Sequence, residues 1–132
     1  MSDFSTLKVL VADDSADIRA LLSLYLKRSG AQELQAENGR QAVDLALEQQ
    51  PDLVLMDMEM PVMGGAEATR ALRSTGYQGA ILAMTAHEDS RQTQIMRDAG
   101  CNGILEKPLR RRKLLEVLAD CHIQQQAGRD DG

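Results

Sequence analysis

The stretch Leu53–Gly65 reads LVLMDMEMPVMGG and decides the fold of this chain. It opens with an apolar run that ends at Asp57, and a loop with one proline and two glycines follows at once. A continuous apolar run of this kind is typical of a strand that is covered on both faces of a parallel sheet. In open parallel sheets, ligands bind just beyond the carboxyl ends of such strands. Asp57 is therefore the first candidate for a functional residue.

Three further strand-like runs also lead into polar side chains at their carboxyl ends: Asp13 and Asp14 after residues 7–12, Thr85 after residues 80–84, and Lys107 after residues 104–106. If these strands are parallel neighbours, their carboxyl ends meet at one edge of a sheet. Three acids, a hydroxyl and an ammonium would then converge at that edge.

The rest of the chain predicts the architecture around these runs. Strand-like runs alternate with amphipathic helical patterns five times, which is typical of an α/β doubly wound parallel sheet with five strands and five flanking helices. Ser15 is placed to cap the first helix, and Gly30 to end it in a left-handed conformation. The helical spacing predicts Leu21 on the buried face of the first helix and Leu47 on that of the second.

Length and composition restrict the classes of protein. The chain has 132 residues, enough for one domain, which we expect over residues 1–124 with a polar, frayed tail over residues 125–132. A net charge of −5 argues against a nucleic-acid partner. No apolar run approaches the roughly 20 residues that span a bilayer, so we expect a cytoplasmic protein without membrane contact. The seven methionines are interpreted as flexible core filler, because aromatic residues make up only 2% of the chain.

Clustered carboxylates predict a cation site. Holding several carboxylates together is electrostatically costly, so such a cluster usually shares protons or binds a cation. Oxygen ligands suit Mg²⁺, or Mn²⁺, and Asp13, Asp14 and Asp57 could hold the ion while a phosphate oxygen completes its shell. Asp57 could then attack phosphorus and form an acyl phosphate, with Lys107 neutralising charge and Thr85 donating a hydrogen bond.

The chain resembles the response-regulator receiver domains of two-component signalling, such as chemotaxis regulators, in the order and approximate spacing of four motifs: Asp13-Asp14, Asp57, Thr85-Ala86 and Lys107-Pro108. The resemblance covers nearly the whole chain, and Leu53–Gly65 looks like the family's phosphoacceptor segment. It implies a flavodoxin-like sheet with the strand order 2-1-3-4-5.

The resemblance also implies a role for each matching residue in a phosphorelay. Asp57 would accept a phosphoryl group from the phosphohistidine of a histidine kinase or a histidine phosphotransfer protein. Asp14 and Asp57 would bind Mg²⁺ directly, Asp13 would act mainly through metal-bound water, and Glu59 would offer its backbone carbonyl. The domain would catalyse its own phosphorylation and dephosphorylation without being an enzyme for a separate substrate.

Four groups would bind the phosphoryl oxygens in such a domain: the Lys107 ammonium, the Thr85 hydroxyl and the backbone amides of Met58 and Ala86. The Lys107-Pro108 bond is typically cis in the family. The phosphorylated state would be read by a downstream protein, and the domain would be a monomer or a weak homodimer.

Three positions concern switching and phosphoryl lifetime. Many receivers carry Tyr or Phe at the position of Ile104, where the ring responds to phosphorylation, and an aliphatic side chain supplies fewer polar contacts for a two-state switch. The resemblance also places Glu59 and His87 at two variable positions, which in the family tune how long the phosphoryl group lasts. Glu59 could orient a hydrolytic water or repel the incoming phosphate, and both possibilities stay open.

Several alternatives also stay open. The chain could be a free-standing regulator or a receiver from a longer protein such as a hybrid histidine kinase. A pseudo-receiver that acts without phosphorylation is a second reading. A third is a phosphohydrolase of the haloacid-dehalogenase type, in which an acid also stands two positions after the nucleophile, as Glu59 does after Asp57. The early position of Asp13-Asp14 disfavours that enzyme, because its acid pair follows its nucleophile.

Overall fold

The computed structural model describes residues 4–87 and 91–130. Strands and helices alternate strictly over this part of the chain: β1 Lys8–Ala12, α1 Ala16–Ser29, β2 Gln32–Ala36, α2 Gly39–Gln49, β3 Leu53–Asp57, α3 Gly65–Ser74, β4 Ala80–Thr85, α4 Arg91–Ala99, β5 Gly103–Glu106 and α5 Arg111–Asp130. No helix in the described part of the chain has both the length and the apolar character that crossing a membrane requires.

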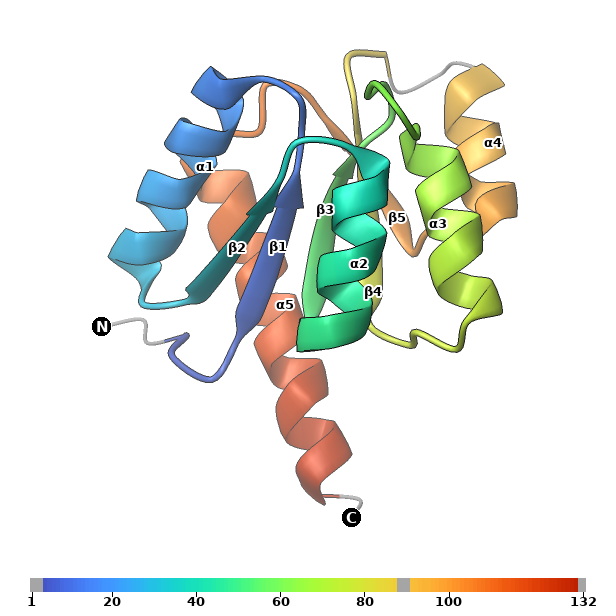
Figure 1. Cartoon of the computed structure of the whole chain (residues 1–132). Coiled ribbons are helices and arrows are strands. Elements are labelled where there is room, and N and C mark those ends of the chain that lie inside the picture. Colours follow the sequence, from blue (N-terminus) through green and yellow to red (C-terminus); the bar gives the residue numbers. More distant parts are fainter. Residues whose placement is uncertain (1–3, 88–90, 131–132) are drawn as a thin grey trace.

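The strands form one parallel five-stranded sheet in the order β2-β1-β3-β4-β5, which confirms the predicted fold class and strand order. Helices α2, α3 and α4 cover one face of the sheet, and α1 and α5 cover the other (Figure 1). Because the sheet is covered on both faces, its central strand β3 is buried along its whole length. This burial explains the continuous apolar run that ends at Asp57.

The core is aliphatic and lies in two layers, one on each face of the sheet. Leu22 of α1 and Leu118 of α5 belong to the first layer, and Ala42 of α2, Leu72 of α3 and Met96 of α4 to the second. Each of these side chains is at most 1% exposed. Burial of side chains from every helix in these layers fixes the helices on the sheet, and so fixes the loops that carry the site.

Helix α1 begins and ends as predicted, but its buried stripe is narrower than predicted. The Ser15 hydroxyl accepts a hydrogen bond from the Ile18 N–H at 3.3 Å, and Gly30 ends the helix with a φ of 89°. The prediction that Leu21 and Leu47 are buried is wrong, because these side chains are 43% and 37% exposed. A helix that packs on a sheet buries only the residues that point at the sheet, and residues beside that stripe stay at the rim.

Helix α5 is longer than the sequence indicated. The prediction of a polar, frayed tail over residues 125–132 is wrong for residues 125–130, because α5 continues to Asp130 and extends past the sheet (Figure 1). Residues 131 and 132 lie outside the described part of the chain. Gln125 fastens this extension to the start of the chain. The Thr6 hydroxyl donates to Gln125 Oε1 at 2.7 Å, and Gln125 Nε2 donates to the Thr6 carbonyl at 2.8 Å. The domain boundary near residue 124 stays a prediction.

We predict that Gln125→Ala lowers the free energy of unfolding by about 1 kcal/mol, because its hydrogen bonds to Thr6 are lost. Gln126→Ala is the matched control, since Gln126 is exposed on the same helix turn and should change the free energy by less than about 0.5 kcal/mol. Urea denaturation of the two variants measures both values. Equal effects would show that Gln125 does not fasten the helix end.

Candidate functional site

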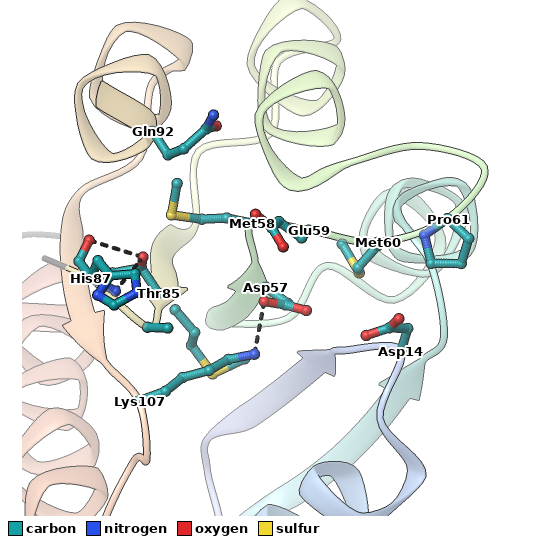
Figure 2. A pocket seen from close by; sticks show the side chains of 12 residues that line it. Asp14, Asp57, Met58, Glu59, Met60, Pro61, Thr85, His87, Gln92 and Lys107 are labelled. Carbon is teal, nitrogen blue, oxygen red and sulfur yellow. Dashed lines mark hydrogen bonds and ion pairs between the residues drawn. The ribbon is translucent and has the colours of Figure 1, made fainter. Parts of the chain in front are cut away.

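The carboxyl ends of β1, β3, β4 and β5 meet around one open cavity of about 760 Å³. Figure 2 shows Asp14, Asp57, Thr85 and Lys107 on its walls. The parallel register brings Asp57 beside Met84 of β4, so the phosphoacceptor candidate and the end of β4 lie at the same level of the sheet. The structure therefore brings together the acids, the hydroxyl and the ammonium that the sequence places at four strand ends.

The three aspartates form a compact cluster. One carboxylate oxygen from each of Asp13, Asp14 and Asp57 lies within 4.8 Å of the others. Asp13 is 0% exposed and Asp57 is 5% exposed, whereas Asp14 faces solvent. Asp13 Oδ1 accepts the Ser15 N–H at 2.9 Å, and its buried Oδ2 has no hydrogen bond. Such a mixture of buried and exposed oxygen donors fits a hard divalent cation such as Mg²⁺, which keeps several waters.

Lys107 is the counter-ion of the two buried acids. Its Nζ donates a hydrogen bond to Asp57 Oδ1 at 2.9 Å and lies 3.1 Å from Asp13 Oδ2. The contact with Asp13 Oδ2 is an ion pair, and this oxygen accepts no other hydrogen bond in the described part of the chain. The Lys107-Pro108 peptide bond is cis, as the family resemblance implied. One ammonium is thus shared by the two acids that are shielded from water, and it offsets one of their two negative charges.

The pKa values of Asp57 and Lys107 are both raised, but for different reasons. Burial raises the pKa of Asp57 above its ordinary value and the charge of Asp13 adds to the rise, while the hydrogen bond from Lys107 opposes it. Burial alone would lower the pKa of Lys107, but the hydrogen bond to Asp57 and the charges of Asp57 and Asp13 outweigh it and raise the pKa. Lys107 therefore stays charged at neutral pH.

Thr85 is turned toward its own loop. Its hydroxyl donates to the His87 carbonyl at 3.1 Å and accepts the His87 N–H at 3.1 Å. Ala86 and His87 are exposed at the mouth of the cavity. Ile104 is half-buried on β5 and packs against the core layer under α2, α3 and α4. Thr85 and Ile104 thus occupy neighbouring strands, and Thr85 holds the loop that follows β4.

The loop after Asp57 depends on close backbone approach. The Gly65 N–H donates to the Met58 carbonyl at 3.1 Å, and the Met58 N–H donates to the Met84 carbonyl at 3.3 Å. A Cβ atom on Gly65 would lie 2.3 Å from the Asp57 carbonyl oxygen, which no side chain tolerates. Gly65 therefore lets the chain fold back over the strand end, and this return shapes one wall of the cavity.

Two residues that support the site were not identified from the sequence. Arg19 Nη1 donates to the Asp13 carbonyl at 2.7 Å, and the Gly39 N–H donates to the Met63 carbonyl at 2.9 Å. A Cβ atom on Gly39 would lie 2.3 Å from that Met63 oxygen. Arg19 lies in α1 only six residues after Asp13, but no sequence pattern marks it as the partner of this carbonyl. Gly39 meets Met63 because the parallel topology brings the start of α2 beside the loop after β3.

Val62 adopts an unusual backbone conformation on the same loop. Its φ is 69°, and the Met63 N–H donates to the Pro61 carbonyl at 2.7 Å across it, which forms a tight three-residue turn. The side chain is 82% exposed. A β-branched residue is strained in this region of φ, because its branched side chain crowds the backbone.

A family model of the response regulator receiver domain matches residues 9–119. The chain is 37% identical over 115 residues to two-component response regulator 24 of Arabidopsis thaliana, and the match covers 86% of this chain and 83% of that protein. It is 36% identical over 112 residues to the autoinducer 1 sensor kinase/phosphatase LuxN of Vibrio harveyi. That match covers 85% of this chain but only 13% of the sensor kinase.

Solved structures agree with this match. The receiver domain of sensor histidine kinase PA1611 from Pseudomonas aeruginosa has a magnesium ion in its active-site cleft. It matches this chain with a TM-score of 0.80 at 30% identity, and the match covers 85% of this chain and 93% of that one. A second match is the co-crystal structure of the histidine phosphotransfer protein Ypd1 and the receiver domain of Ssk1 from Saccharomyces cerevisiae. The TM-score is 0.83 at 26% identity, and the match covers 90% of each chain.

We predict that Val62→Asn raises the free energy of unfolding by about 0.5–1 kcal/mol, because asparagine tolerates a positive φ. Val62→Thr is the matched control, since threonine is also β-branched and should bring no such gain. Thermal denaturation of both variants measures the difference. A stabilisation by threonine equal to that by asparagine would contradict strain at Val62.

We predict that Asp57→Asn is more stable than the wild type at pH 7 and that this difference shrinks as the pH falls. Because the pKa of Asp57 is raised in the folded state, its ionised form destabilises the fold above that pKa. Protonation at lower pH removes this effect from the wild type, whereas asparagine does not titrate. Urea denaturation at several pH values between 7 and 4 measures the free energy of unfolding of both proteins. If the advantage of Asp57→Asn grew as the pH fell, the raised pKa of Asp57 would be refuted.

Proposed function

The chain belongs to the response-regulator receiver family, and from this premise we propose that it is a phosphoacceptor domain in which Asp57 takes a phosphoryl group from a phosphohistidine. The observation that carries the proposal is the cluster of Asp13, Asp14 and Asp57 with the Lys107 ammonium bound to its two buried members. The cluster combines a nucleophile, cation ligands and a fixed positive charge, which are the parts that phosphoryl transfer to a carboxylate needs.

The two oxygens of Asp57 have different roles in this proposal. Lys107 donates to Oδ1, so Oδ2 is the oxygen that attacks phosphorus. A bond forms between Oδ2 and phosphorus as the phosphorus–nitrogen bond to the donor histidine breaks, and the electron pair of that bond stays on the imidazole nitrogen. The product is an acyl phosphate on Asp57 and a free histidine on the donor.

The acidic cluster would hold Mg²⁺ through the side chains of Asp14 and Asp57, through water on Asp13, and through the Glu59 backbone carbonyl. Bound Mg²⁺, or Mn²⁺ in its place, supplies positive charge that offsets the acids and the transferred group. The magnesium in the similar PA1611 receiver supports this assignment. In this chain, the three carboxylate oxygens of Asp13, Asp14 and Asp57 within 4.8 Å of one another support it further.

The remaining cavity groups bind the phosphoryl oxygens. Lys107 pairs with the phosphoryl charge, and the Ala86 amide donates a hydrogen bond to it. The Met58 amide, which donates to the Met84 carbonyl at 3.3 Å, would exchange that partner for a phosphoryl oxygen. The Thr85 hydroxyl must leave its partner His87 to reach the phosphoryl group, so phosphorylation would release the loop after β4. Because Ile104 has no hydroxyl, this movement would pass to β5 by packing alone.

The donor would be a sensor histidine kinase or a histidine phosphotransfer protein, as for the receiver of Ssk1 with Ypd1. A downstream protein would read the phosphorylated surface, and the domain would act in the cytoplasm as a monomer or weak homodimer. Glu59 and His87 flank the cavity and would set the lifetime of the acyl phosphate. The match within LuxN fits a receiver from a longer sensor kinase, and that to regulator 24 fits a free-standing domain.

We predict a single phosphate adduct on the wild type after incubation with Mg²⁺ and acetyl phosphate, and none on Asp57→Asn. The amide keeps the shape of the side chain but lacks the nucleophilic oxygen. Intact-mass spectrometry before and after base treatment measures the adduct and its lability, because an acyl phosphate is cleaved by base.

Glu59→Gln is the matched control, because it changes an exposed acid of the same loop while the nucleophile stays. It should still gain the adduct. An adduct of equal size on Asp57→Asn would overturn the assignment of Asp57. A folded wild type that binds Mg²⁺ but gains no adduct would favour a pseudo-receiver.

A further inference from the structure

The methionines around Asp57 differ sharply in exposure. Met56, Met58, Met60 and Met63 stand within eight residues of the sequence. Met56 is 0% exposed, as core filler should be, whereas Met58, Met60 and Met63 are partly exposed. The core explains the first of these side chains but not the accessibility of the other three.

Two of the three accessible methionines line the same cavity as Asp57. Met58 reaches toward Gln92 of α4, and Met60 lies beside Pro61 at the cavity wall (Figure 2). Met63 is partly exposed but is not one of the lining residues. The cavity, at about 760 Å³, is far larger than a peroxide molecule, given that a water takes up about 30 Å³. Hydrogen peroxide is also uncharged, so the acidic cluster does not repel it.

The two cysteines compete poorly for an oxidant. Burial raises the pKa of Cys101, and it raises the pKa of Cys121 to about 11. Because the thiolate is the reactive form of cysteine, both thiols are largely unreactive at neutral pH. A thioether has no proton to lose, so its reactivity depends on exposure alone. Met58 and Met60 are therefore the reactive sulfurs that lie at the site.

Oxidation of Met58 would disturb the loop that carries the site. Its side chain packs against the apolar layer under α2, α3 and α4. Its backbone joins β4 and α3, because its N–H donates to Met84 and its carbonyl accepts from Gly65. A sulfoxide oxygen is a strong hydrogen-bond acceptor that has to be solvated, so the modified side chain would leave the apolar layer and shift this backbone.

We propose that Met58 and Met60 form a peroxide-modification site that slows phosphorylation of Asp57. Hydrogen peroxide transfers one oxygen atom to the thioether sulfur, its oxygen–oxygen bond breaks, and a sulfoxide and one water are formed. The sulfur is oxidised by two electrons and the peroxide is reduced. The effect on phosphorylation rests on the proposed function, whereas the site of oxidation does not.

The test treats the full chain with hydrogen peroxide, then with dithiothreitol, which reverses cysteine oxidation but leaves sulfoxides in place. Peptide mass spectrometry locates each gain of one oxygen, and the initial rate of phosphorylation by acetyl phosphate with Mg²⁺ follows. The variants are Met58→Leu/Met60→Leu and the matched control Met63→Leu. Each rate is divided by the rate of the same variant before peroxide, so that any direct effect of a substitution cancels.

We expect Met58 and Met60 to be oxidised before Met56, Met84 and Met96, and the wild-type rate to fall by about fivefold or more. The phosphorylation rate of Met63→Leu should fall by the same factor, whereas Met58→Leu/Met60→Leu should keep most of its rate. Methionine sulfoxide reductase should restore the rate of the oxidised wild type. Equal losses in the double variant, or oxidation without any loss of rate, would overturn the proposal. An untreated wild type that gains no phosphate would instead overturn the proposed function, and the peptide map would still decide whether these two sulfurs are oxidised first.

Discussion

The ammonium of Lys107 between Asp57 and Asp13 is the interaction on which the site depends. Two carboxylates that are almost fully buried a few ångströms apart repel each other and lack water to screen them. Lys107 offsets part of this cost at 2.9 and 3.1 Å, and the pKa of Asp57 stays raised. The arrangement requires β1, β3 and β5 to end at the same edge of the sheet. The parallel sheet therefore positions the three charged groups as well as the core.

Hydrogen bonds and close contacts to backbone groups hold the loops around this cluster. Asp13 is fixed through its own carbonyl by Arg19 and through Oδ1 by the Ser15 N–H, which leaves Oδ2 for a cation or for Lys107. On the other side, Gly65 lets the loop after Asp57 return close to the strand end. These contacts hold the acids in place, whereas the Thr85 hydroxyl is bonded to His87, just after β4, and can exchange this partner. A rigid acceptor beside an exchangeable hydroxyl is the arrangement that a phosphorylation switch needs.

The sequence predicts the strands and the chemical groups well because both depend on local patterns. The apolar run of β3 predicts a strand that is buried on both faces, and the polar residues at four strand ends predict that these ends meet at one edge of the sheet. Gly39 acts through a contact with the distant Met63, and Arg19 acts on the nearby Asp13 carbonyl through a side-chain direction that no pattern within α1 marks. Leu21 was misjudged because helical spacing gives the direction of a face but not its width. The extension of α5 depends on Gln125 meeting Thr6, which only the folded chain shows.

The most direct measurement is the affinity for Mg²⁺, by isothermal titration, of the wild type, Lys107→Ala and the exposed-lysine control Lys113→Ala. If Lys107 shares the buried carboxylates with the cation, its removal takes away a competing charge, and Lys107→Ala should bind Mg²⁺ about threefold or more tightly than the wild type. Lys113→Ala should be unchanged, because Lys113 lies on the surface of α5 and pairs with Glu116. Loss of Mg²⁺ binding in Lys107→Ala, or equal affinities in all three proteins, would contradict a cation site built on the carboxylates that Lys107 neutralises.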